Sequence, residues 1–186
     1  TIIPWDLNEA FGNFNCGCDR DGIIGFLMDE PTCGPLSQRP LAAALLAVPE
    51  YKAKYHAYLE EFLAGPFSEA TMSTWIQEAA DLIRPYVQAD PTKFFSYDQF
   101  EQALVGDVQG GGPSSAIGLE AFVSDRGANL SQQLSGAVKA DNGGAGNCGG
   151  GNKPGDGKPP EGNGQKCPDG ICDAFEQANP DACPQD

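Results

Sequence analysis

The large apolar side chains of this sequence are concentrated in one part of it. Residues 1–138 carry almost all of them, and residues 139–186 carry almost none. A core needs apolar side chains that pack together, and a segment without them cannot offset the entropy lost on folding. We therefore expect one folded domain of ordinary size, with appendages on its C-terminal side.

The composition of the appendages divides them in two. Residues 141–166 hold ten Gly and three Pro among 26 residues and no large apolar side chain, which is typical of a flexible linker. A short cysteine-rich segment follows. The sequence thus predicts a domain at residues 1–139, a flexible Gly/Pro-rich linker at 140–166 and a Cys-rich module at 167–186.

The domain is predicted to be mainly α-helical, with a short irregular or β segment at its N-terminus. Residues 1–5 could end a strand, and residues 22–28 (GIIGFLM) could form another strand or pack under a loop. Apolar residues then recur at helical spacing. Helices are expected over 41–48, from Pro49 to Gly65, from the capping residue Ser68 to a kink or end at Pro85, from Ser96 with Gln99 as a capping box, and over 117–138.

The charge of the chain argues against two classes of partner. A formal net charge of −15 at pH 7 would repel nucleic acid and anionic membrane surfaces, whose binding relies on Lys and Arg. No apolar run approaches the roughly 20 residues of a membrane span, so none is expected. No signal peptide is visible and the sequence opens at Thr1, so we expect a piece of a longer chain.

Seven cysteines lie in Gly-, Asp- and Pro-rich surroundings rather than in helical stripes. That placement favours disulfides and an oxidising compartment, and hence a secreted, extracellular or periplasmic protein. We expect Cys33 to pair with either Cys16 or Cys18. A zinc site is the competing interpretation, and it is weaker because no CxxC pair occurs and the single histidine, His56, is far from every cysteine in sequence.

Two acidic segments partly match the pattern of a calcium-binding loop. Asp19, Asp21 and Glu30 have the spacing of three ligand positions, but an isoleucine occupies the position where the sharp turn needs Gly. In the Cys-rich module, the acids of CPDGICDAFE also fail the template, although a small disulfide-bounded Ca²⁺ loop stays open there. His56, beside Lys52 on its helix, is interpreted as a solvated surface residue.

The N-terminal segment PWDLNEAFG (residues 4–12) carries a candidate metal site. Asp6 follows an apolar run, and Asn8 and a glycine-containing turn follow Asp6. A carboxylate at the end of a strand, beside an amide, is an arrangement used to hold Mg²⁺ on nucleotide phosphates. A buried Asp6 that accepts hydrogen bonds at a turn is the alternative.

The same segment resembles the PWDLn..FG segment of the CotH (spore coat protein H) kinase family. The similarity extends in order over about residues 1–138, through Asp29–Pro31, Arg39–Leu41, Leu45–Tyr51, Tyr55–Leu59, Gly65–Ser68, Ile83–Val87 and Asp90–Phe94. The resemblance implies that the helices are part of the large lobe of an atypical protein kinase. It also implies an enzyme that uses ATP and Mg²⁺ to phosphorylate Ser or Thr of a protein substrate, with Asp6 as a metal ligand and Asn8 as a weaker neighbour.

The remaining parts of such a kinase would lie before Thr1. These are the nucleotide-binding lobe, its phosphate-contacting Lys and the catalytic-base Asp, so this chain alone is expected to be inactive and to hold no catalytic base. Two alternatives stay open. One is a catalytically dead, kinase-derived protein of structure or surface assembly, and the other is an extracellular protein with a calcium-binding adhesion tail.

Overall fold

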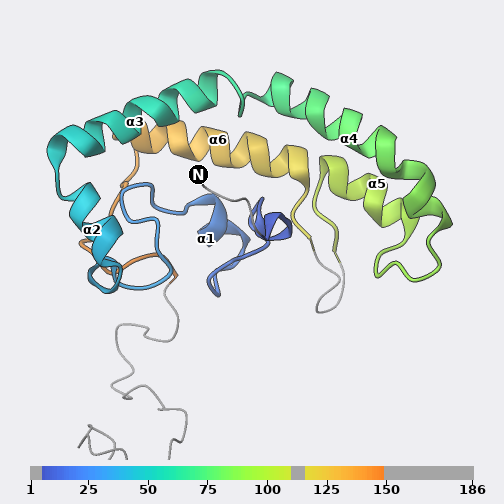
Figure 1. The fold of residues 1–186 in the computed structure, drawn as a ribbon, viewed down its shortest axis with the longest axis horizontal. Coiled ribbons are helices and arrows are strands. Elements are labelled where there is room, and N and C mark those ends of the chain that lie inside the picture. Colours follow the sequence, from blue (N-terminus) through green and yellow to red (C-terminus); the bar gives the residue numbers. More distant parts are fainter. Residues whose placement is uncertain (1–5, 110–115, 149–186) are drawn as a thin grey trace, which may run out of the picture. The chain divides into compact units, whose positions relative to one another are not determined.

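The computed structural model describes residues 6–109 and 116–148 (Figure 1). The chain divides into two compact units, Thr1–Gly149 and Gly150–Asp186, and all of the described residues lie in the first unit. The Cys-rich module and most of the expected linker lie outside the described residues. Their predicted flexibility and Ca²⁺ binding therefore stay predictions.

The first unit is mainly helical, as the sequence predicts. Its elements are the 3₁₀ turns η1 (Leu7–Glu9) and η2 (Leu36–Gln38) and the helices α1 (Arg20–Ile24), α2 (Pro40–Leu46), α3 (Pro49–Ala64), α4 (Glu69–Ala89), α5 (Tyr97–Val105) and α6 (Leu119–Leu134). The described residues form no strand, only an isolated antiparallel bridge between Val108 and Ala116. The strand suggested for residues 22–28 is therefore wrong. Asp19 caps a helix there by accepting the amide of Gly22 at 2.9 Å.

Local signals set the ends of the longer helices. Pro49 occupies the first turn of α3. Ser68 caps α4, and Ser96 caps α5 with the complete predicted capping box, in which Gln99 N–H donates to Ser96 Oγ at 3.1 Å and Ser96 N–H to Gln99 Oε1 at 2.9 Å. Of the two outcomes expected at Pro85, the end of the helix is wrong, because α4 continues to Ala89. The ring removes a single helical N–H, and the Asp90 amide still closes the last turn on the Tyr86 carbonyl at 3.0 Å.

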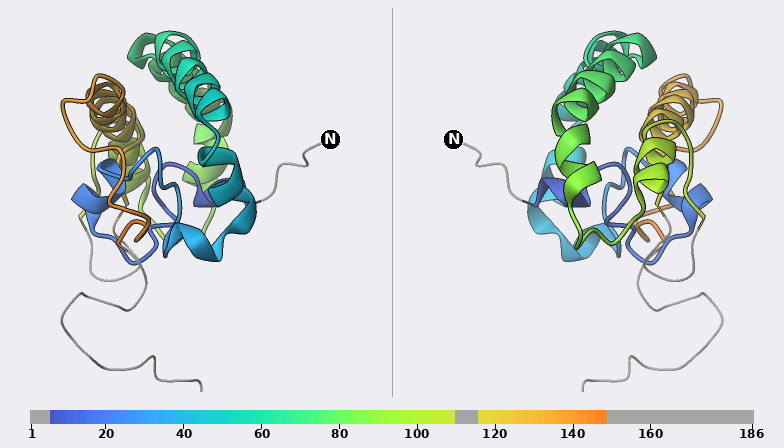
Figure 2. Two further views of the ribbon diagram at one scale, coloured as in Figure 1. Left: turned by 90° about the vertical axis from the view of Figure 1, so that its left-hand side faces the viewer. Right: turned by 90° about the vertical axis from the view of Figure 1, so that its right-hand side faces the viewer.

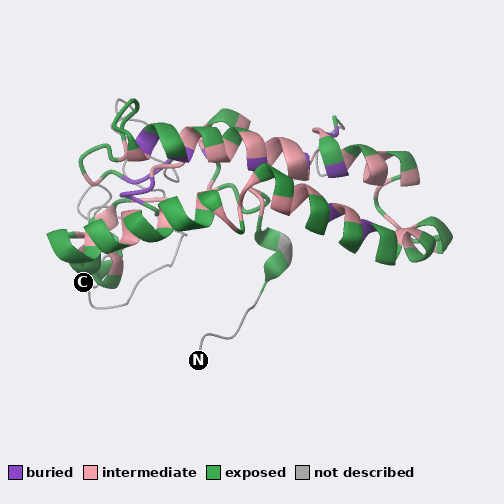
Figure 3. Cartoon of the chain, turned by 90° about the horizontal axis from the view of Figure 1, so that it is seen from above, coloured by how far each residue is buried: buried purple, intermediate pink, exposed green. Residues whose placement is uncertain are grey.

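Helix α6 is the centre of the unit. It contacts α1, α3, α4 and α5, and the views along the helices show α3 and α4 on one side and α6 on the other (Figure 2). The buried residues lie partly on α4, α5 and α6 and partly in segments outside the helices (Figure 3). Ile76, Ala80 and Leu104 form the cluster between α4 and α5, and Val123 and Leu130 are the buried apolar residues of α6.

A second buried region is a loop, residues 27–32, which we call the buried loop. Its backbone is bound by side chains from distant parts of the sequence. Gln133 of α6 accepts the Met28 amide at 2.8 Å, and Asn147 accepts the Leu27 amide at 2.7 Å while donating to the Glu30 carbonyl at 2.5 Å. Because a buried backbone polar group without a partner is costly, these two amide side chains make burial of the loop possible.

Glu30 joins the buried loop to the end of the described chain. Only 3% of the residue is exposed. Its carboxylate accepts the backbone amides of Asn142 at 3.2 Å and Gly146 at 3.1 Å, and also that of Gly144. Glycines at positive φ in this segment let successive amides point at one carboxylate. The Ca²⁺ loop considered for Asp19, Asp21 and Glu30 is therefore excluded, since Glu30 binds these amides and Asp19 caps α1.

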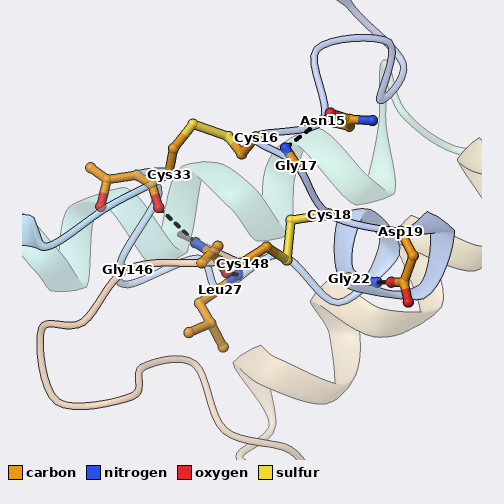
Figure 4. The surroundings of a disulfide bond; sticks show 12 residues. Asn15, Cys16, Gly17, Cys18, Asp19, Gly22, Leu27, Cys33, Gly146 and Cys148 are labelled. Carbon is orange, nitrogen blue, oxygen red and sulfur yellow. Dashed lines mark hydrogen bonds between the residues drawn. A yellow bond between two sulfur atoms is a disulfide. The ribbon is translucent and has the colours of Figure 1, made fainter. Parts of the chain in front are cut away.

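Two disulfides fasten the same region (Figure 4). Cys16 pairs with Cys33, which confirms one of the two expected pairings, and Cys18 pairs with Cys148 across 130 residues of sequence. The second bond, together with the amides on Glu30, makes residues 140–148 part of the first unit although their composition places them in the linker. A Gly-rich segment can pack when an acidic side chain and a disulfide supply the partners that apolar side chains would otherwise supply.

The Glu30 contacts predict a large effect of a small substitution. Glu30→Gln keeps the shape of the side chain but removes its charge, so the buried amides lose charge-assisted hydrogen bonds. We expect the free energy of unfolding to fall by about 1.5 to 3 kcal/mol, measured by urea denaturation with the disulfides intact. Glu60→Gln, on an exposed position of α3, is the control and should change it by less than about 0.5 kcal/mol. If Glu30→Gln and Glu60→Gln both changed the free energy of unfolding by the same small amount, Glu30 would not be what holds residues 140–148.

Candidate functional site

An open cleft of about 560 Å³ lies between the N-terminal segment and the connection from α5 to α6. Leu7, Phe11 and Gly12 line it on one side, and Asp107 and Ile117 on the other. The N-terminal side is therefore formed by residues between Leu7 and Asn13, most of them in the segment that the sequence singles out, and Asp6 directly precedes the first residue of the cleft wall.

The turn after η1 is fixed by close packing. At Gly12 the backbone has φ +80°, and a Cβ there would stand 2.7 Å from Cγ2 of Ile23 and 3.2 Å from Cδ1 of Ile117. A side chain would thus be strained by the backbone and would collide with α1. Next to it, Phe11 packs edge-on against Phe122 of α6 with ring centroids 5.8 Å apart. These contacts hold the N-terminal segment, and with it η1, against the helices.

Asp6 begins η1 in the left-handed conformation, at φ 51° and ψ 43°. Its carbonyl accepts the Glu9 amide at 2.9 Å, whereas its carboxylate makes no capping hydrogen bond and the residue is exposed. The alternative of a buried, hydrogen-bonded Asp6 is therefore wrong. Asn8 lies in the same turn, two residues further on. The fold leaves the Asp6 carboxylate accessible to a ligand.

An ion-pair network at the wall of the cleft was not predicted from the sequence. Arg20 of α1 binds Asp107 through Nε at 2.5 Å and Asp125 of α6 through Nη2 at 2.7 Å. These hydrogen bonds, that of Asp125 first, raise the pKa of Arg20 above its usual value. Asp107 also accepts the Gly118 amide at 2.9 Å, so it fixes the start of α6. Arg20 is thereby committed to the wall of the cleft.

Asp29 organises a second polar cluster, at the buried loop. Its carboxylate binds Nζ of Lys52 and Nε2 of His56, each at 2.6 Å, and its side chain is only 6% exposed. The interpretation of His56 as a solvated surface residue is therefore wrong. The spacing of four residues between Lys52 and His56 on α3 is the signal that could have suggested a shared partner, but the sequence does not identify Asp29.

The predicted site residues are thus near the cleft but do not form a complete metal site. No group of three or more His, Cys, Asp or Glu side chains within residues 6–109 and 116–148 is arranged to hold a metal ion. Asp6 and Asn8 share one turn, while the acids across the cleft are engaged by Arg20. None of the helices in this described part is long and apolar enough to cross a membrane.

The network around Arg20 predicts unequal effects for its two acids. The Asp107 side chain is 23% exposed and that of Asp125 46% exposed. Asp107→Ala also leaves the Gly118 amide without its acceptor, so we expect a loss of about 2 kcal/mol in the free energy of unfolding. Asp125→Ala removes a more exposed ion pair, so it should lower the free energy of unfolding by less than about 0.5 kcal/mol. Urea denaturation of both variants tests this, and a larger loss for Asp125 would contradict it.

Comparison with known proteins identifies a family. Searches of curated proteins and of solved structures found no match. The family model described as CotH kinase protein matches residues 1–109. That match covers more than half of the chain, and it contains η1 with Asp6, the buried loop and α2 to α5. The chain therefore belongs to the CotH kinase protein family.

Proposed function

We propose that this chain supplies a metal-binding part of a secreted CotH-type kinase, which transfers the γ-phosphoryl group of ATP to Ser or Thr of a protein. The family match over residues 1–109, which includes Asp6, is the observation that carries the proposal. The disulfides Cys16–Cys33 and Cys18–Cys148 are compatible with an oxidising, extracellular or periplasmic location.

The chemistry of Asp6 fits one ligand of a Mg²⁺ ion that is shared with phosphates. Mg²⁺ prefers oxygen ligands, keeps several waters, and is held in nucleotide sites by one or two carboxylates together with phosphate oxygens. An exposed carboxylate that makes no capping hydrogen bond suits this role. Asn8, in the same turn, is proposed as a neighbouring contact to the nucleotide. With Mg²⁺ bound, the charge on the phosphates would be partly neutralised where the γ-phosphoryl group is transferred.

A single metal ligand is not enough for this reaction. Phosphoryl transfer depends on several groups that position the nucleophile and stabilise charge at the same time. Among the described residues that line the cleft the cation is Arg20, and it is paired with Asp107 and Asp125. We therefore expect the chain alone to be inactive, with its activity expressed only in a longer protein that contributes the Lys and the catalytic base.

The proposal predicts a different result for Asp6→Asn in two measurements. In the longer protein, transfer of ³²P from ATP to a protein acceptor should fall by at least about a hundredfold, because the amide keeps the shape but loses the charge that attracts the metal. In the isolated chain the melting temperature should hardly change, since the Asp6 carboxylate is exposed. Glu60→Gln, which removes one exposed charge from α3, is the matched control for both measurements.

Three outcomes separate the alternatives. Normal transfer with Asn at position 6 would end the assignment of Asp6 as a metal ligand. An absence of transfer by the unsubstituted longer protein would favour a catalytically dead, kinase-derived scaffold. A large drop in the melting temperature of the isolated Asp6→Asn chain would assign Asp6 a structural role instead.

A further inference from the structure

Two disulfides start from one tight turn. In the turn Asn15–Cys18 the Cys18 amide donates to the Asn15 carbonyl at 2.7 Å, and the two central residues have positive φ, 55° at Cys16 and 76° at Gly17. The Asn15 side chain accepts the Gly17 amide at 3.0 Å, as Figure 4 shows. This is the backbone of a hairpin-type turn, which suits Asn and Gly.

The turn brings the two cysteines within reach of each other. A β-turn folds four residues so that the first and last Cα atoms are less than about 7 Å apart, and Cys16 and Cys18 are only two residues apart within it. Disulfides form between residues whose Cα atoms lie within about 7 Å. Residues two apart in a chain have Cα atoms no more than about 7 Å apart, so the Cα atoms of Cys16 and Cys18 lie within the range in which a disulfide can form.

The distant partners of the two cysteines also lie side by side. The Asn147 amide donates to the Thr32 carbonyl at 2.8 Å, so the residues that follow them, Cys148 and Cys33, come from adjoining segments. Cys18 is 7% exposed, whereas Cys16 and Cys33 are half-buried and Cys148 is exposed. Each disulfide thus includes at least one cysteine residue that is not buried, while Cys18 is buried.

We propose that the Asn15–Cys18 turn is an intramolecular thiol–disulfide exchange site. When one thiolate of an external dithiol attacks the sulfur of Cys33, the Cys16–Cys33 bond breaks and Cys16 leaves as a thiolate. Cys16 then attacks the sulfur of Cys18. The Cys16–Cys18 bond forms, the Cys18–Cys148 bond breaks, and Cys148 leaves as a thiolate and takes up a proton.

The balance of the reaction closes on the dithiol. Its second thiol displaces Cys33 from the mixed disulfide, so the dithiol becomes a cyclic disulfide and gives up two electrons. Attack at the exposed Cys148 leads to the same product, because the released Cys18 thiolate attacks Cys16 and displaces Cys33. From either side, one equivalent of the dithiol, which supplies two electrons, produces a Cys16–Cys18 bond and free thiols at Cys33 and Cys148.

The exchange makes loss of the two long-range cross-links a single event. A simple reduction would open one bond and leave the other in place. Exchange at the turn releases both the segment that carries Cys33, next to the buried loop, and the segment whose amides hold Glu30. Since Cys18 also lines the cleft, the oxidation state of the turn is coupled to the cleft wall. This inference does not depend on the proposed kinase function.

The sharpest test uses Cys33→Ser without any reductant. In this full-length variant Cys16 is left as a free thiol, and the exchange predicts that it displaces Cys148 spontaneously. Acid quenching, alkylation and tryptic peptide mapping should then find the label on Cys148, with Cys16 and Cys18 linked inside one peptide that ends at Arg20. Cleavage after Lys139 and Lys166 places Cys148 on a peptide that holds no other cysteine, because Lys153 and Lys158 are each followed by a proline and are not cut.

Cys16→Ser is the matched control. It removes the attacking thiol, so among the cysteines before Lys166 the label should appear on Cys33 only, with the Cys18–Cys148 bond intact. If Cys33→Ser instead carries its label on Cys16 and retains Cys18–Cys148, the exchange is refuted.

The unsubstituted protein supplies a second test that does not depend on a variant folding. With less than one equivalent of dithiothreitol, the first product should carry labels on both Cys33 and Cys148. Labels on Cys16 and Cys33 together, or on Cys18 and Cys148 together, would mean that each disulfide is reduced independently and would overturn the proposal. The cysteines after Lys166 fall on a separate tryptic peptide, so they do not confuse the pattern.

Discussion

The burial of one carboxylate, that of Glu30, is the constraint on which the non-helical half of the unit depends. A buried carboxylate is tolerated only when hydrogen bonds replace its hydration. Here the replacement comes from backbone amides more than a hundred residues further along the chain. The buried loop and residues 140–148 must therefore fold together. The loop supplies the carboxylate acceptor, and residues 140–148 supply the amide donors.

The helices and the N-terminal segment contribute differently to the candidate site. The facing apolar sides of α4, α5 and α6 build a conventional core. Outside this core, α6 also supplies Asp125, which accepts a hydrogen bond from Arg20. In its described part, from Asp6 to the start of α1, the N-terminal segment has no helix beyond the 3₁₀ turn η1. It is positioned instead by Gly12 against α1, by Phe11 against α6, and by the disulfides from Cys16 and Cys18. Asp6 is presented at the edge of the cleft by this scaffold.

The sequence predicts well those features that are encoded locally. The start of α3 at Pro49, the cap of α4 at Ser68 and the capping box at Ser96 all involve residues within one or two turns of each other. Features that join distant residues were missed. Nothing near Cys148 indicates Cys18 as its partner, and the Gly-rich composition of residues 140–148 conceals their contacts with Glu30. The accessibility of Asp6 likewise depends on how the whole N-terminal segment packs.

The central claim is that Asp6 binds a divalent ion together with a nucleotide, and metal binding tests it most directly. Mn²⁺ is a paramagnetic substitute for Mg²⁺ in oxygen-ligand sites. Electron paramagnetic resonance would count the Mn²⁺ bound by the longer protein with and without ATP. Mn²⁺ binding should depend on the nucleotide, be lost in Asp6→Asn and be retained in Glu60→Gln. Undiminished binding with Asn at position 6 would contradict it.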